Sequence, residues 1–123
     1  MPDASSTAVT IYHNPNCGSS RNALAALRSK CVDLEVVEYL KNPPDRATLE
    51  RIVAALEDPV GDLVRKDSLF AKLDLDPSEY TEPEPVIELL LDHKALMQRP
   101  VIVKGGRAII GRPTSRVKEL LAD

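Results

Sequence analysis

Aromatic side chains are scarce in this sequence: they make up 3% of its 123 residues, and tryptophan is absent. The apolar content is nevertheless 43%, which is enough for a hydrophobic core in one domain of this length. The core must therefore consist mostly of leucine, valine, isoleucine and alanine.

The sequence also lacks a secretory signal and a long apolar run. Its opening, Met-Pro-Asp-Ala-Ser-Ser-Thr, has neither the basic segment nor the apolar segment of a signal peptide, and no stretch is long and apolar enough to suggest a membrane-spanning helix. We therefore expect a cytoplasmic protein without a membrane partner. The formal net charge of −3 argues against nucleic acid as a general partner, because binding to the phosphate backbone needs a basic face.

Cysteine is rare too. The sequence has two cysteines, Cys17 and Cys31, and two histidines, His13 and His93. A reducing compartment disfavours a structural disulfide, and the spacing of these four residues fits no zinc motif, so we expect no metal. Cys31 falls at the far end of the helix predicted after Cys17. Because a disulfide needs Cα atoms within about 7 Å, we expect Cys31 to be a packing residue.

The order of the predicted elements indicates the fold class. Apolar periodicity and turn residues predict, in chain order, a strand over 9–12, a helix over 19–29, a strand over 34–39, helices over 47–56, 58–66, 69–73 and 86–92, strands over 101–103 and 108–110, and a helix after Pro113. A β-α-β half and a β-β-α half around a helical insertion of about residues 43–95 predict an α/β, thioredoxin-like fold with a mixed four-stranded sheet, in one domain over residues 1–123. In that fold the reactive cysteine follows the first strand, and a proline before the third strand, here Pro100, usually faces it and is usually cis.

The functional prediction depends on Cys17. The strand over 9–12 ends at a polar turn and a helix begins at about Ser19, so Cys17 lies at a helix N-terminus. Unpaired backbone N–H groups and the helix dipole favour negative charge there, which lowers the pKa of a thiol and makes it a thiolate nucleophile near neutral pH. A lone cysteine is more often a small buried apolar residue, but the polar neighbours Asn16 and Gly18 are unlike a core strand.

The residues around Cys17 separate the possible cysteine chemistries. A dithiol oxidoreductase needs Cys-x-x-Cys, and the last position of that motif is Ser20 here. A cysteine phosphatase needs an arginine after five intervening residues, where this sequence has Ala23. What remains is a single thiolate with Arg21 one helical turn later, so a thiol from another molecule must complete any redox cycle. His13, at the end of the strand, is placed to act as a proton partner or to stabilise the thiolate when protonated.

Arginines stand at several predicted element ends. Arg99 and Arg112 each precede a proline and therefore have extended backbone, and Arg65 ends a predicted helix of the insertion. If Pro100 faces Cys17, Arg99 does as well. Guanidinium groups that converge on a thiolate would bind a tetrahedral oxyanion through permanently charged, bidentate donors. A solvated surface position is the alternative for each arginine, and the pattern alone does not single out these residues.

Several motifs, in order and spacing, resemble the glutaredoxin-coupled arsenate reductases of the ArsC type. They are His13-Asn-Pro-x-Cys17-Gly-x-Ser20-Arg21, Tyr39-Leu40-x-Asn-Pro-Pro44, Leu63-Val-Arg-Lys66, Gln98-Arg-Pro100 followed by Val-Ile-Val, and Arg112-Pro113. The match extends over about residues 10–121, nearly the whole chain. The resemblance implies reduction of arsenate to arsenite, with glutathione as co-substrate, glutaredoxin as a partner and no bound cofactor.

The resemblance also implies the site residues. They are the nucleophile Cys17, the histidine His13 that affects its pKa, the oxyanion-binding arginines Arg65, Arg99 and Arg112, and Ser20 and Arg21 close to the thiolate and its substrate. Two alternatives stay open: a glutathione-dependent thiol reductase of the same fold that ignores arsenate, and an Spx-like regulator that binds RNA polymerase. The first has no need of an oxyanion site, and the second typically uses the Cys-x-x-Cys motif that Ser20 interrupts.

Overall fold

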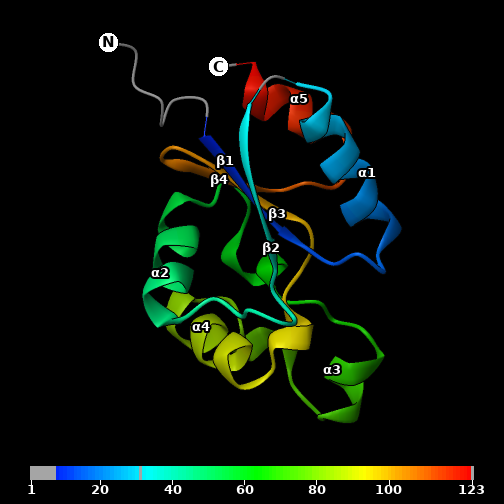
Figure 1. The fold of residues 1–123 in the computed structure, drawn as a ribbon. Coiled ribbons are helices and arrows are strands. Elements are labelled where there is room, and N and C mark those ends of the chain that lie inside the picture. The colour runs from blue at the N-terminus through cyan, green and yellow to red at the C-terminus, as the bar shows by residue number, and fades with distance from the viewer. Residues whose placement is uncertain (1–7, 31, 123) are drawn as a thin grey trace.

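A mixed four-stranded sheet lies between two layers of helices in the computed structural model, which describes residues 8–30 and 32–122 (Figure 1). The strands are β1 (Ala8–His13), β2 (Asp33–Glu38), β3 (Val101–Lys104) and β4 (Arg107–Ile110), in the spatial order β2-β1-β3-β4. β1 and β2 are parallel, and β3 is antiparallel to β1 and β4. This is the thioredoxin-like arrangement that the element order predicted. Cys31 lies outside the described residues, so its packing role stays a prediction.

One face of the sheet is covered by α1 (Gly18–Arg28), which connects β1 to β2, and by α5 (Ser115–Leu121), which follows β4 (Figure 1). The buried side chains between these helices and the sheet are Val9, Ile11, Ala23, Leu24, Leu27, Ile102, Ile109, Val117 and Leu120. Leu24 and Leu27 lie one helical turn apart and so face the sheet together. This cluster contains only aliphatic side chains, as the low aromatic content predicted.

The opposite face is covered by helices from the segment between β2 and β3. The segment contains α2 (Arg46–Ala55), α3 (Ser68–Lys72) and α4 (Pro83–Asp92), with short 3₁₀ turns at Val60–Leu63, Pro77–Glu79 and Lys94–Leu96. Of these helices, α3 lies away from the strands (Figure 1). α2 and α4 pack against each other beneath the sheet (Figure 1). Asp45 caps α2 by accepting a hydrogen bond from the backbone N–H of Thr48 (2.9 Å), which satisfies a donor that the first helical turn leaves unpaired.

Two elements differ from the sequence-based expectation. The helix expected over 58–66 is only the 3₁₀ turn Val60–Leu63, because Gly61 favours a helix weakly and Val64 forms an isolated antiparallel bridge with Met97. Arg65 therefore follows a β-bridge and does not end a helix. The last helix begins at Ser115 and not at Pro113, which precedes its N-cap.

The topology brings the functional segments to one edge of the sheet. Tyr12, near the end of β1, pairs with Val101 at the start of β3, and Val101 pairs with Ile110 at the end of β4. The loop after β1, the segment before β3 and the segment after β4 therefore meet at this edge. The Arg99–Pro100 peptide bond is cis, as is usual for the proline before the third strand of this fold.

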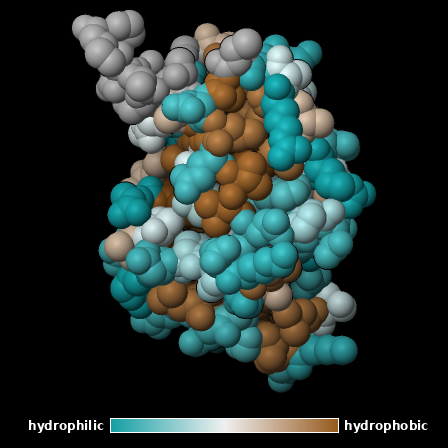
Figure 2. All heavy atoms as spheres, in the orientation of Figure 1, coloured by the Kyte–Doolittle hydropathy of each residue, from teal (hydrophilic) through white to brown (hydrophobic). Residues whose placement is uncertain are grey.

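Apolar side chains reach the surface mainly in the upper half of the view in Figure 2, over the region where the strands run in Figure 1. Among large apolar residues, Val36 in the edge strand β2 and Leu91 in α4 are exposed, at 37% and 42%. Within residues 8–30 and 32–122, no helix has both the length and the apolar character needed to cross a lipid bilayer.

Candidate active site

Cys17 occupies the N-cap position of α1 with an extended backbone (φ −109°, ψ 125°). Hydrogen bonds fix the loop before it: the N–H of Cys17 donates to the carbonyl of Asn14 (3.0 Å), and the N–H of Asn16 donates to Oδ1 of Asn14 (2.9 Å). The thiol is half-buried and forms no disulfide. It is therefore held at the point where the first helical turn presents unpaired N–H groups.

The pKa of the Cys17 thiol is lower than its ordinary value. Burial acts in the opposite direction and would raise it, but a hydrogen bond from Arg99, the backbone N–H of Ser20, the positive charge of Arg99 and the backbone N–H of Ser19 together outweigh burial. Each of these groups stabilises the thiolate over the neutral thiol. The backbone N–H groups of the first helical turn are the cause expected from the sequence, and the guanidinium that acts with them belongs to Arg99, in the segment before β3.

His13 contacts Ser20 and makes no hydrogen bond with the thiol among the described residues. Its Nδ1 lies 2.6 Å from Oγ of Ser20, which also accepts a hydrogen bond from the N–H of Asn14 (3.0 Å). Burial lowers the pKa of His13, so the imidazole is neutral at pH 7. We infer that its influence on Cys17 passes through the position of Ser20, whose backbone N–H faces the sulfur, and not through a positive charge.

Ser20 is fully buried at the position where a dithiol enzyme would have its second cysteine. Its hydroxyl is shared by His13 and the backbone of Asn14, so this position joins the end of β1 to the first turn of α1. Its role in this structure is to hold the loop that carries Cys17.

Tyr39 is a member of the site that sequence reasoning did not assign. It follows β2 and is completely buried. Its hydroxyl is hydrogen-bonded by the side chains of Arg99 and Asn14 and lies in the field of Arg65. Because Oδ1 of Asn14 is engaged within the loop, the amide nitrogen of Asn14 is the group that faces the phenol oxygen. Burial raises the pKa of Tyr39, so the hydroxyl stays neutral and accepts these hydrogen bonds.

Arg99 and Arg65 lie together around this phenol. Arg99 reaches both Cys17 and Tyr39, and its Nε is buried without a hydrogen-bond partner among the described residues. Arg65 is 26% exposed and donates from Nη1 to Oδ2 of Asp67 (2.9 Å). An orphaned N–H on a guanidinium that already touches the thiolate is a donor available to an anionic substrate.

Arg112 and Arg21 are more peripheral. Nη1 of Arg112 donates to Oε1 of Gln98 (3.3 Å), and the same oxygen accepts from the N–H of Arg99 (3.3 Å). Gln98 therefore links the segments before β3 and after β4. Arg21 donates to the carbonyl of Pro15 (2.9 Å) on the exposed side of the loop. Among the described residues, neither Arg112 nor Arg21 hydrogen-bonds Cys17.

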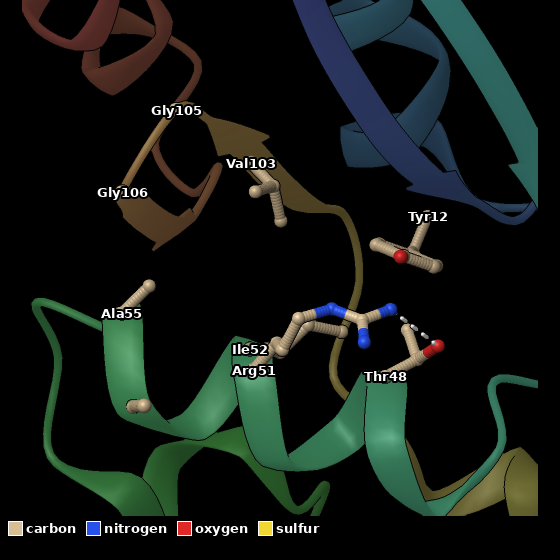
Figure 3. A pocket seen from close by; sticks show the side chains of 9 residues that line it. Tyr12, Thr48, Arg51, Ile52, Ala55, Val103, Gly105 and Gly106 are labelled. Carbon is tan, nitrogen blue, oxygen red and sulfur yellow. Dashed lines mark hydrogen bonds between the residues drawn. The ribbon is translucent and has the colours of Figure 1, made fainter.

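Two of the hollows lined by the described residues lie near the sheet. A polar one of about 400 Å³ lies at the same sheet edge and includes Gln98 and Arg112 in its walls. The other, of about 430 Å³, lies between α2 and the β3–β4 turn (Figure 3). There the guanidinium of Arg51 donates to Oγ1 of Thr48 (3.2 Å), and Tyr12 points in from β1. The second hollow contains none of the residues grouped around Cys17.

Comparison with known proteins agrees with this geometry. The model of the ArsC family matches residues 12–120. The chain belongs to the ArsC family. It is 44% identical to an arsenate reductase of Rhizobium meliloti (strain 1021) over 117 residues, 94% of this chain and 82% of the relative. It is 41% identical to the uncharacterized protein YfgD of Escherichia coli (strain K12) over 115 residues, 92% of this chain and 96% of that protein.

A solved structure, the arsenate reductase from Vibrio cholerae, superposes on this ArsC chain with a TM-score of 0.81 at 32% sequence identity. The superposition covers 93% of this chain and 98% of the Vibrio protein. Tyr39 and Gln98, which lack an assigned role in the sequence analysis, both lie within motifs that carried the resemblance. Their place in those motifs was the one sequence signal that could have identified them as site residues. Which groups they contact could be learned only from the structure.

Proposed function

We propose that this ArsC chain reduces arsenate to arsenite, with Cys17 as the nucleophile and with glutathione and glutaredoxin as electron donors. The observation that carries the proposal is the contact between the Cys17 thiol and the guanidinium of Arg99, whose buried Nε has a free N–H among the described residues. The names of the Rhizobium and Vibrio relatives support the same activity.

The first step needs a thiolate and a site for a tetrahedral oxyanion. The Cys17 sulfur attacks arsenic(V) and forms an S–As bond, while one arsenate oxygen takes up protons and leaves as water. Arg99 and Arg65 balance the charge on the remaining oxygens, and we propose Arg112 as a third donor at the edge of the site. Fixed guanidinium groups stabilise the developing charge without reorganisation during the reaction.

Reduction then needs two electrons, which two external thiols supply. Glutathione displaces a second oxygen from arsenic as water and forms an As–S bond. A glutaredoxin thiolate attacks the glutathione sulfur, so that a mixed disulfide forms and the electron pair of this As–S bond passes to arsenic, giving arsenic(III). Hydrolysis of the bond to Cys17 releases arsenite and restores the thiol. A buried serine at position 20 supplies no competing internal thiol.

The proposal is tested by arsenate-dependent NADPH oxidation in a mixture of glutathione, glutaredoxin and glutathione reductase. We expect turnover by the unaltered chain and only the enzyme-free background with Cys17→Ser. Arg65→Ala should raise the KM for arsenate while leaving Cys17 open to alkylation. Equal rates for the unaltered chain and Cys17→Ser would refute the proposal. Reduction of glutathione mixed disulfides without any arsenate turnover would favour the thiol reductase alternative.

A further inference from the structure

The polar hollow at the sheet edge does not include Cys17. It lies next to the segment that carries Arg99, the arginine that contacts the Cys17 thiol. Its volume is about 400 Å³, within the range of small-molecule sites. The 3₁₀ turn Val60–Leu63 and the residues next to it form one wall, and the segment before β3 and the segment after β4 form the others. Charged or polar groups supply most of this lining.

Part of the lining is already paired and forms a rigid wall. Asp58 and Arg116 form an ion pair (2.8 Å). The second carboxylate oxygen of Asp58 accepts from the N–H of Ile110 (3.0 Å), and Arg116 donates to the carbonyl of Ile110 (2.8 Å). Because these groups satisfy one another, they fix the position of the end of β4 and are not the groups that would hold a ligand.

Three other groups in the hollow keep unused hydrogen-bonding capacity. Oε1 of Gln98 accepts hydrogen bonds from Arg112 and from the backbone N–H of Arg99, so the amide nitrogen of Gln98 remains as a donor for a ligand. Lys66 contacts two backbone carbonyls with an ammonium that has three donors. The carboxylate of Asp62 is exposed and forms no hydrogen bond or ion pair among the described residues; only the backbone N–H of Asp62 is bonded, to the carbonyl of Pro59 (2.9 Å). The hollow thus offers cationic and amide donors for a carboxylate and, beside them, a carboxylate for an ammonium group.

The distance to Cys17 suits a short peptide. Cys17 follows β1, whereas the hollow lies past the end of β4, and β3 separates these strands. Two strand spacings amount to about 10 Å, which is also about the length of an extended tripeptide. The N–H of Gly111 donates to the carbonyl of Pro100 (2.8 Å), so the segments that join the hollow to Arg99 lie side by side.

We propose that this hollow binds the thiol co-substrate: a peptide thiol that carries carboxylates and an ammonium group, such as glutathione. Lys66 and the amide of Gln98 hold a carboxylate, Asp62 holds the ammonium, and the thiol extends past Arg99 toward the arsenic bound to Cys17. Arg112 stands at the boundary between this peptide and the oxyanion. The inference rests on the proposed function, because only that function calls for an external thiol.

Binding is tested without arsenate and without thiol chemistry. S-methylglutathione, whose sulfur is blocked, is titrated into the full chain while backbone amide NMR shifts are followed. We expect saturable shifts at residues 61–66 and 110–112. Asp62→Asn and Lys66→Met should each raise the Kd roughly tenfold, the effect of losing one charge-assisted hydrogen bond. Glu79→Gln and Lys72→Met, which remove the same charges from exposed positions outside this hollow, should leave it unchanged.

A kinetic comparison separates charge recognition from general damage. In the arsenate assay, Asp62→Asn and Lys66→Met should raise the KM for glutathione roughly tenfold and leave the KM for arsenate unchanged. With 2-mercaptoethanol in place of glutathione, and with arsenite formation measured directly, both variants should match the unaltered chain, because this uncharged thiol makes no use of these groups. Equal losses with both thiols would overturn the proposal.

The binding and kinetic arms also distinguish this inference from the proposed function. If no thiol supports arsenate reduction but S-methylglutathione binds at residues 61–66 and 110–112, the function fails and the peptide site stands. If arsenate is reduced but the shifts are absent, or lie only around the α2 hollow of Figure 3, the inference fails and the function stands.

Discussion

Replacing Tyr39 with phenylalanine is the sharpest test of how the site is built. The ring is completely buried, so Tyr39→Phe keeps the packing and removes one oxygen. That oxygen accepts hydrogen bonds from Arg99 and Asn14 and lies 3.5 Å from the carbonyl of Met97. Without it, two buried donors lose their acceptor, and Arg99 loses the contact that fixes its guanidinium beside Cys17.

The magnitude follows from the cost of leaving buried donors unpaired. Removing one partner of a buried hydrogen bond costs about 1–3 kcal/mol, so we expect the free energy of unfolding to fall by about 2 kcal/mol. For a chain of this length that lowers the melting temperature by roughly 8 °C. Because Arg99 is no longer held, the pKa of Cys17 should also rise toward its ordinary value.

Two measurements on the same variant check these effects: urea denaturation, and the pH dependence of Cys17 alkylation by iodoacetamide. Tyr80→Phe is the matched control, because Tyr80 stacks edge-on against Phe70 (ring centroids 6.0 Å apart) and its hydroxyl has no hydrogen bond among the described residues. The control should change the free energy of unfolding by less than about 0.5 kcal/mol. If Tyr39→Phe behaves like this control in both measurements, the role assigned to the phenol is wrong.

Substitutions at three further positions probe the surroundings of the site. Arg99→Gln removes the charge beside the thiol, so the pKa of Cys17 should rise and alkylation should need a higher pH; an unchanged profile would exclude Arg99 as the main stabiliser. Burial lowers the pKa of His13 below 6.5, so the unfolded chain binds its proton more readily, and the free energy of unfolding should decline as pH falls below that value; His13→Gln should remove this component in urea denaturation. Asp67 caps α3 and pairs with Arg65, so Asp67→Ala should cost about 1 kcal/mol in thermal unfolding, and Asp67→Asn, which retains a capping oxygen, should cost less.

Sequence patterns within single helices, strands and turns predicted the features that neighbouring residues determine. The order of strands and helices, the aliphatic core beneath α1 and the place of Cys17 at a helix N-terminus all follow from periodicity, composition and turn residues. The fold class then follows, because few topologies accommodate this order. The edge at which the loop after β1 meets the segment before β3 is a consequence of the topology.

The contacts within the site required tertiary structure. Tyr39 and Met97 are 58 positions apart in sequence, and a tyrosine beside a strand is ordinary β-sheet composition, so its hydroxyl network leaves no local signal. Arg65 was expected at a helix end, but the Val64–Met97 bridge sets its position. His13 was expected either to act as a proton partner or to stabilise the thiolate when protonated; burial lowers its pKa, which disfavours the charged form, and that burial depends on tertiary packing.

The most direct test of the central claim is to measure arsenite itself, by chromatographic separation of arsenic species, in reactions with glutathione and glutaredoxin. We expect arsenite to accumulate in step with NADPH oxidation for the unaltered chain. We also expect Cys17→Ser, with its fold verified by circular dichroism, to yield no more arsenite than the enzyme-free mixture. Arsenite formation by Cys17→Ser at the rate of the unaltered chain would contradict the assignment of Cys17 as the nucleophile.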